Sequence, residues 1–243
     1  MDFFAPETIA IAALVAVLAG VIRGITGFGG AMVMSPPLAL LLGPLLMVPA
    51  VLLLEGVAAL PMLAQTHRLA RFRTIAPIIV AACVAAPLGT YVLVASDPQV
   101  LRRVIAAMVI GFSLLLLQGW RYGGPQRVAT GAGLGALSGA MASATSIGGP
   151  PVILYLLAGP DPIETTRANL TFFICAISIA GVAMLAFAGA LDPRSAWIAA
   201  ALTPGYLAGI VAGTKLFARF DDRRFRQLTL VLMMAVSAGI LAA

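Results

Sequence analysis

The amino-acid sequence predicts an all-α integral membrane protein of two inverted repeats, each a broken-helix or re-entrant hairpin followed by three transmembrane helices. Composition is the first indication, because 61% of the 243 residues are apolar and only 10% are charged, against about 25% charged in soluble domains. Long apolar segments also recur along the chain, and two pairs of shorter ones share an uncharged break. A soluble fold could not hide this much apolar surface, so we expect a bilayer as its solvent.

The long apolar segments have the length that a helix needs to cross the hydrocarbon core, about 20 residues. We expect six of them, at residues 47–66, 75–95, 100–118, 166–188, 195–217 and 226–243. Four shorter segments form two pairs, 8–22 with 31–43 and 128–143 with 150–159.

A break without any charged residue separates the members of each pair. It covers Gly24–Gly30 in the first pair and Ser143–Gly149 in the second. The two breaks align at an offset of 119 residues, and Gly20 falls on Gly139 at the same offset. This local similarity favours two related halves.

The positions of the basic residues predict the orientation, because Lys and Arg gather in cytoplasmic loops. Eleven of the 15 lie in three short segments and at one helix start, namely 67–74, 119–127, 215–226 and Arg167. Segment 47–66 then runs from outside to inside, and the two hairpins open on opposite sides. Residues 1–120 therefore form a first transmembrane repeat, and residues 126–243 form a second, inverted one.

We expect a multi-pass protein of the bacterial inner membrane with both termini in the periplasm. The acidic start, MDFFAPE, lacks the positively charged region of a secretory signal peptide, so no cleavage is expected. The basic excess lies mostly in short loops, which predicts the lipid bilayer and no nucleic acid as a partner. The oligomeric state stays open.

Inverted repeats with interrupted helices are a transporter design, with the breaks near the midplane where the repeats meet. A break in a membrane helix leaves backbone groups without partners, and it persists only when buried in protein or lining an aqueous cavity. The helix that follows offers N–H donors and a positive dipole end. The expected site is therefore a central anion site. The alternative is that the small residues only let helices pack closely.

The candidate substrate-binding residues lie at the two breaks and at one helix start. They are Arg23, Thr26, Gly27, Gly29, Gly30, Thr145, Ser146, Gly148, Gly149 and Asn169. Arg23 is the sharpest candidate, because an intramembrane arginine is costly and a guanidinium can clamp an oxyanion. Alternatively, Arg23 snorkels to the interface or is neutralised by Glu55. The Thr and Ser hydroxyls contact either the ligand or their own backbone.

Glu55 and Arg167 are candidates for coupling or gating. Glu55 lies near the middle of segment 47–66, and removal from water favours the protonated form of a carboxyl group. It is therefore a candidate carrier of a coupled proton, or else a structural partner of Arg23. Arg167 and Asn169 open segment 166–188 as a gate contact or an interface anchor.

Enzyme chemistry is not expected. The chain has one His and two Cys, so we expect neither a metal site nor a cofactor. The spans contain no Ser-His-Asp, His-Glu-x-x-His or paired-carboxylate arrangement. The expected partners are a small anion and, as a candidate coupling ion, the proton.

Two runs resemble signatures of the sulfite exporter TauE/SafE family. They are GITGFGGAMVMSP, from Gly24 to Pro36, and LSGAMASATSIGGPPVILY, from Leu137 to Tyr155, followed by RANL from Arg167. The chain departs from the family where Ala31 replaces a frequent third glycine, and where Ser143 and Ala144 stand at common glycine positions. The resemblance covers nearly the whole chain.

The resemblance implies secondary transport, often export, of small sulfur-containing anions such as sulfite, sulfoacetate or other organosulfonates. We expect alternating access, with the anion bound between the two helix breaks. The alternatives are an anion channel of the same architecture, a transporter for another small organic anion, and a membrane protein that transports nothing. Composition and spacing alone predict only an anion-friendly inverted-repeat transporter.

Overall fold

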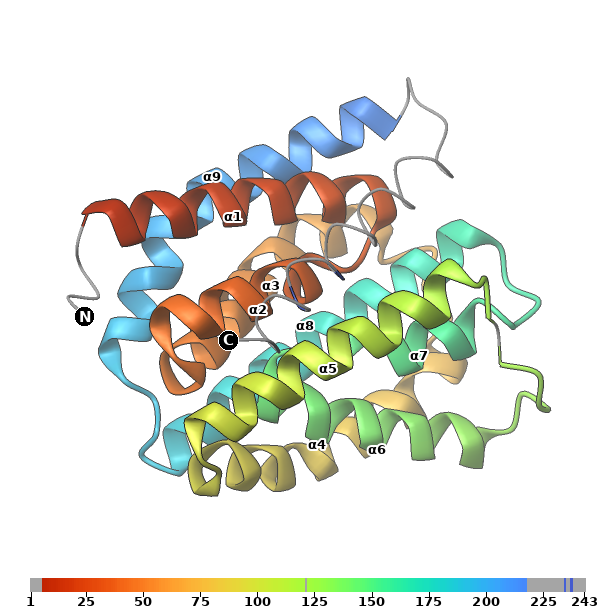
Figure 1. Ribbon diagram of the computed structural model, residues 1–243. Coiled ribbons are helices and arrows are strands. Elements are labelled where there is room, and N and C mark those ends of the chain that lie inside the picture. Colours follow the sequence, from red (N-terminus) through yellow and green to blue (C-terminus); the bar gives the residue numbers. More distant parts are fainter. Residues whose placement is uncertain (1–5, 121, 218–233, 235–236, 238–243) are drawn as a thin grey trace.

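The structure is a computed structural model of the chain that describes residues 6–120, 122–217, 234 and 237 (Figure 1). Within these residues it contains nine α-helices and no strand, which confirms the all-helical prediction. The helices are α1 (Pro6–Thr26), α2 (Gly30–Leu42), α3 (Pro44–Thr66), α4 (Phe72–Ala95), α5 (Pro98–Leu117), α6 (Val128–Thr145), α7 (Gly149–Leu156), α8 (Ile163–Phe187) and α9 (Pro193–Phe217). The predicted segment 226–243 lies outside the described residues.

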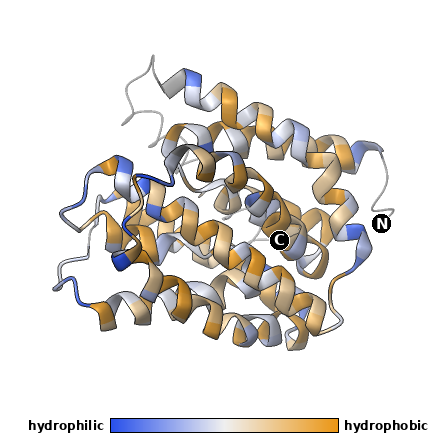
Figure 2. Ribbon diagram, turned by 180° about the vertical axis from the view of Figure 1, so that it is seen from behind, coloured by the Kyte–Doolittle hydropathy of each residue, from blue (hydrophilic) through white to orange (hydrophobic). Residues whose placement is uncertain are grey.

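Six of these helices, α1, α3, α4, α5, α8 and α9, are long and apolar enough to cross a membrane. Figure 2 shows hydrophobic residues over most of the helix surfaces and hydrophilic residues gathered in the connections at the two ends. Large apolar side chains such as Val84, Leu88 and Phe187 are exposed on the outside. The protein is therefore a multi-pass membrane protein, with lipid as the solvent of its outer surface.

Proline and short polar caps fix several helix starts. Pro44 and Pro98 open α3 and α5, where a missing N–H costs no helical hydrogen bond. The Asp97 carboxylate caps α5 by accepting hydrogen bonds from the backbone N–H groups of Gln99 and Val100, at 2.8 and 3.2 Å. These caps place turns at the ends of apolar segments.

Helices α1 and α2 form a hairpin that begins and ends at one end of the bundle. Thr8 near the start of α1, Leu42 at the end of α2 and Trp197 near the start of α9 line one small hollow. The α8–α9 connection lies at this end, which is on the left in Figure 1.

Helices α6 and α7 form a second hairpin at the other end. The Tyr155 hydroxyl donates to the Arg127 carbonyl at 3.1 Å, and the Gln126 side chain donates to the Tyr155 carbonyl at 2.9 Å. These bonds bring the end of α7 back to the start of α6. The α5–α6 and α7–α8 connections lie at this end, on the right in Figure 1.

Each hairpin lies against a long helix from the other half of the chain. Helix α1 packs along α9, α6 packs along α4, and α3 crosses α8 in the centre. The first two contacts bring backbones together at glycine. A Cβ added to Gly20 would lie 2.3 Å from the Tyr206 carbonyl oxygen, and one added to Gly139 would lie 2.1 Å from that of Ala82. Close backbone contact of this kind is typical of transmembrane helix pairs with small residues.

Candidate functional site

The first break joins the end of α1 to the start of α2. Gly27 and Gly29 have φ angles of 81° and 88°, which glycine adopts without strain. The Thr26 hydroxyl donates to the Ile22 carbonyl at 2.8 Å and accepts from the Phe28 N–H at 3.3 Å. The threonine side chain thus replaces part of the helical hydrogen bonding that is lost at the turn.

The second break is built in the same way, 119 residues further on. The Thr145 hydroxyl donates to the Met141 carbonyl at 2.7 Å and accepts from the Ile147 N–H at 3.3 Å. Ser146 takes the place of Gly27 with a φ angle of 62°, the only positive value among the described non-glycine residues. The hydroxyls of Thr26 and Thr145 therefore bond to nearby backbone groups, which was one of the two alternatives expected for them.

A cavity lies between the two breaks and the middles of α3 and α8. The centre of a water-sized sphere can occupy about 40 Å³ of it, whereas a single water needs roughly 10–15 Å³ by the same measure. The wall comprises Phe28, Gly29, Ala31, Met32, Leu52, Glu55, Ala142, Ser146, Ile147, Gly148, Gly149, Pro150, Phe173, Ile174, Ile177 and Ser178. The space suits a few water molecules or one small solute, and most of its wall is apolar.

The cavity wall includes five of the predicted site residues: Gly29, Ser146, Gly148, Gly149 and Glu55. Thr26, Gly27 and Thr145 form the turns beside it, and Gly30 contacts the neighbouring ion pair. Arg23, Arg167 and Asn169 are outside the wall. The structure therefore brings both breaks to one cavity, and its charged wall residue is Glu55.

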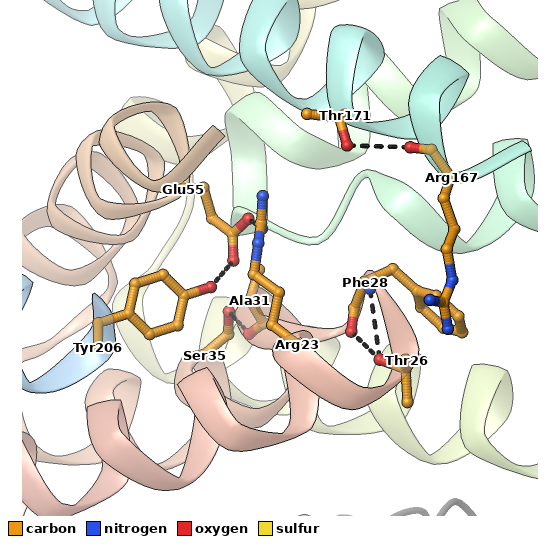
Figure 3. A network of polar contacts seen from close by, with 9 residues as sticks. All are labelled: Arg23, Thr26, Phe28, Ala31, Ser35, Glu55, Arg167, Thr171 and Tyr206. Carbon is orange, nitrogen blue, oxygen red and sulfur yellow. Dashed lines mark hydrogen bonds and ion pairs between the residues drawn. The ribbon is translucent and has the colours of Figure 1, made fainter. Parts of the chain in front are cut away.

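Arg23 and Glu55 form an ion pair beside the cavity, completed by Tyr206 from α9 (Figure 3). The Tyr206 hydroxyl donates to Oε1 of Glu55 at 2.6 Å, while Arg23 contacts Oε2. The exposed fractions of Arg23, Glu55 and Tyr206 are 1%, 4% and 0%. Arg23 is therefore neutralised by Glu55, which was one of the alternatives that the sequence left open for it.

Sequence reasoning missed Tyr206, which lies in the middle of α9. A tyrosine far from both membrane interfaces needs a buried partner for its hydroxyl, and that position was the available signal. The pair also explains Gly30, because a Cβ there would lie 2.1 Å from the Tyr206 hydroxyl oxygen and 2.6 Å from Oε1 of Glu55.

Ser35 of α2 was also missed, and it links the two hairpins. Its hydroxyl oxygen lies 2.7 Å from that of Ser146, and both side chains are buried. The Ser146 hydroxyl also lies 3.6 Å from the Met47 sulfur. The first hairpin is therefore joined directly to the second break.

Arg167 and Asn169 connect the start of α8 to other helix ends. The Arg167 guanidinium donates to the Ile25 carbonyl at 3.0 Å, near the C-terminus of α1, where a positive charge complements the helix dipole. Its side chain passes over Gly27, where an added Cβ would lie 3.2 Å from Arg167 Cγ. The Asn169 side-chain oxygen accepts from the Arg71 N–H at 2.8 Å. Both residues thus hold the ends of α1 and α4.

In the part of the chain that the structure describes, no three His, Cys, Asp or Glu side chains lie together in a way that could hold a metal ion. The site consists of backbone turns, hydroxyls and one buried ion pair around a small cavity.

Six potential spans, two hairpins with broken tips and a shared cavity define a multi-pass helical membrane protein of the transporter class. The family model described as "Sulfite exporter TauE/SafE" matches residues 12–240. The chain belongs to this family of membrane transporters, whose members are not enzymes. Comparison with curated proteins gives no match, and comparison with solved structures gives none either.

Proposed function

We propose that this protein is a secondary transporter of small sulfur-containing anions, such as sulfite or an organosulfonate, and that it exports them. The observation that carries the proposal is the cavity between the two breaks, which is small and lined by residues of both hairpins. The family description supports sulfite or a related anion as the substrate. Transport by alternating access places the anion in this cavity while it is open to one side and then to the other.

The break architecture supports an anion rather than a cation as the solute. Helix α2 starts at Gly30 and α7 starts at Gly149, so both N-termini are at the cavity, where the positive dipole end favours negative charge. The first turn of α2 offers backbone N–H donors, whereas in α7 Pro150 and Pro151 have none and Gly149 supplies the N–H. Ser146 and Ser178 also line the wall, and the Ser146 hydroxyl is bonded within the protein. In the proposed site Gly29, Gly30, Gly148 and Gly149 admit the anion, Thr26, Gly27 and Thr145 hold the turns, and Arg23 lies behind the wall in its ion pair with Glu55.

Two inverted repeats, residues 1–120 and 126–243, are part of this proposal. The equal hydrogen bonds of Thr26 and Thr145 support it, as does the reciprocal packing of α1 on α9 and α6 on α4. The predicted periplasmic termini belong to the same proposal. Arg167 and Asn169 then lie at the cytoplasmic end, where their bonds to the first repeat make them candidate gate contacts.

Uptake and counterflow in vesicles test the proposed function. Purified protein in lipid vesicles is expected to move labelled sulfite or sulfonate, and unlabelled anion on the opposite side is expected to accelerate it. Passage without acceleration, together with single-channel currents, would identify an anion channel instead. Absence of any sulfur-anion movement would contradict the proposal.

Gly149→Leu tests the position of the substrate. No atom lies within 4 Å of a Cβ added at Gly149, and this residue lines the cavity, so a leucine fills the cavity without displacing the backbone. We expect loss of transport with a folded protein. Gly133→Leu is the matched control, because Gly133 is exposed on α6 and has no atom near an added Cβ. Equal transport by both variants would place the substrate elsewhere.

A further inference from the structure

We infer that the anion binds together with one proton, which is taken up by Glu55. This inference rests on the proposed function and specifies what couples to it. Glu55 contributes the charged side chain of the cavity wall, and Arg23 lies behind it with an exposed fraction of 1%. The wall therefore presents the negative member of a neutral ion pair to the cavity.

In its ionised state this wall disfavours an anion. A carboxylate is only a hydrogen-bond acceptor, so it has no proton to offer to a sulfite or sulfonate oxygen. The Arg23 charge is already balanced by Glu55, and an added monoanion would leave one net negative charge in a buried, mostly apolar place. An unbalanced buried charge is strongly unfavourable.

Protonation of Glu55 reverses both properties. One proton from water converts the Glu55 carboxylate to a carboxyl group, which carries an O–H donor. The Arg23 charge is then free to balance the anion in front of the carboxyl. Proton, anion and guanidinium together leave the same net charge as the empty ion pair, so one proton accompanies each monoanion.

The surroundings of Glu55 give the proton no other obvious acceptor. Among the described residues, Arg23 from α1 and Tyr206 from α9 are the charged or titratable side chains in contact with Glu55. Helices α2 and α6 carry no titratable side chain, and those of α4, α5, α7 and α8 are absent from the cavity wall. Gly30 leaves the space in which the carboxyl and the Tyr206 hydroxyl meet.

Titration calorimetry with methanesulfonate tests the inference, because a sulfonate stays ionised whereas sulfite itself takes up a proton near neutral pH. Binding to the purified full-length protein is measured in two buffers of equal pH and different ionisation enthalpy, which gives the number of protons taken up. We expect about one proton per anion, and an affinity that falls about tenfold per pH unit on the alkaline side. Binding without proton uptake, or with proton release, would overturn co-binding.

Glu55→Gln separates this residue from other acceptors. The amide is neutral and can donate, so the variant is expected to bind methanesulfonate without proton uptake and with little change between pH values. Tyr206→Phe is the control, because it alters the same site but keeps the carboxyl, and it is expected to keep the uptake of one proton. Continued uptake by Glu55→Gln would overturn the assignment, and if that variant does not fold, the wild-type proton count still decides the inference.

Transport assays separate failure of co-binding from failure of the proposed function. Counterflow of sulfite or methanesulfonate without proton uptake would leave the proposed function standing and reject co-binding. Neither binding nor movement of any sulfur anion would reject both.

Discussion

Gly30 and Gly149 occupy equivalent positions at the two breaks but have different surroundings. A Cβ on Gly30 would overlap the Tyr206 hydroxyl and the Glu55 carboxylate, while one on Gly149 would meet no atom within 4 Å. The chain uses glycine at both places, yet only the first place excludes a methyl group by contact. The two hairpin tips therefore differ, because the ion pair lies beside the first tip and not beside the second.

Alanine substitution at both positions measures this difference. Gly30→Ala is expected to lower the free energy of unfolding by about 1–3 kcal/mol, because it forces Tyr206 and Glu55 apart. Gly149→Ala is expected to stay within about 0.5 kcal/mol of the wild type. Thermal unfolding in detergent gives the comparison, and equal midpoints for the two variants would contradict the described packing around Glu55.

The contacts that the sequence predicted and those that it missed differ in the separation of their partners along the chain. The turns at Thr26 and Thr145 were predictable, because a threonine next to glycines provides a local cap. The contacts of Ser35 with Ser146 and of Glu55 with Tyr206 join residues 111 and 151 positions apart. Such contacts depend on how helices cross, and one sequence does not contain that information.

At the scale of helices, α6 has one face in backbone contact with α4 and another exposed. A Cβ on Gly139 would lie 2.1 Å from the Ala82 carbonyl oxygen, whereas one on Gly133 would meet no atom within 4 Å. Both glycines are within α6 and share its helical geometry, so they form a matched pair.

Gly139→Ala is expected to push α6 away from α4 and to lower stability by about 1–3 kcal/mol. Gly133→Ala, on the same helix, is expected to be neutral or slightly stabilising, because alanine favours helix over glycine. Unfolding midpoints measured in the same detergent decide between them. A neutral Gly139→Ala would mean that α4 and α6 are not held at this distance.

Most helix limits lie within a few residues of the predicted segments, and the differences have physical causes. The first segment was expected to end at residue 22, but α1 continues to Thr26. Arg23 lies within the last turns of this helix, where Glu55 balances its charge. Segment 150–159 ends earlier, at Leu156, where Gln126 and Arg127 of the preceding connection bond to Tyr155.

At the scale of the whole molecule, the Ser35–Ser146 contact lies where the two hairpins meet. The two hydroxyl oxygens are 2.7 Å apart, and a disulfide requires sulfurs about 2.05 Å apart. Cysteines at both positions could therefore form a disulfide after a small movement. Under alternating access the two hairpins must move relative to each other during the transport cycle. A covalent bond between them should hold one state.

We therefore expect a Ser35→Cys/Ser146→Cys variant to lose transport after oxidation and to regain it on reduction. Cys83 and Cys175 are replaced by alanine beforehand, and the two single-cysteine variants receive the same oxidant as controls. Vesicle uptake of labelled sulfite is the measurement. Full transport by the oxidised double variant would show that the hairpins need not separate here.

The packing of α1 on α9 also has a consequence for biosynthesis. A ribosome releases the first hairpin long before α9, yet Gly209 of α9 packs on α1 and Tyr206 of α9 completes the surroundings of Glu55. The nascent protein must therefore keep a charged pair in the bilayer while its cover is still being translated. Chains that stop short of α9 should remain open to membrane proteases, and assembly should finish only after nearly the whole polypeptide has been inserted.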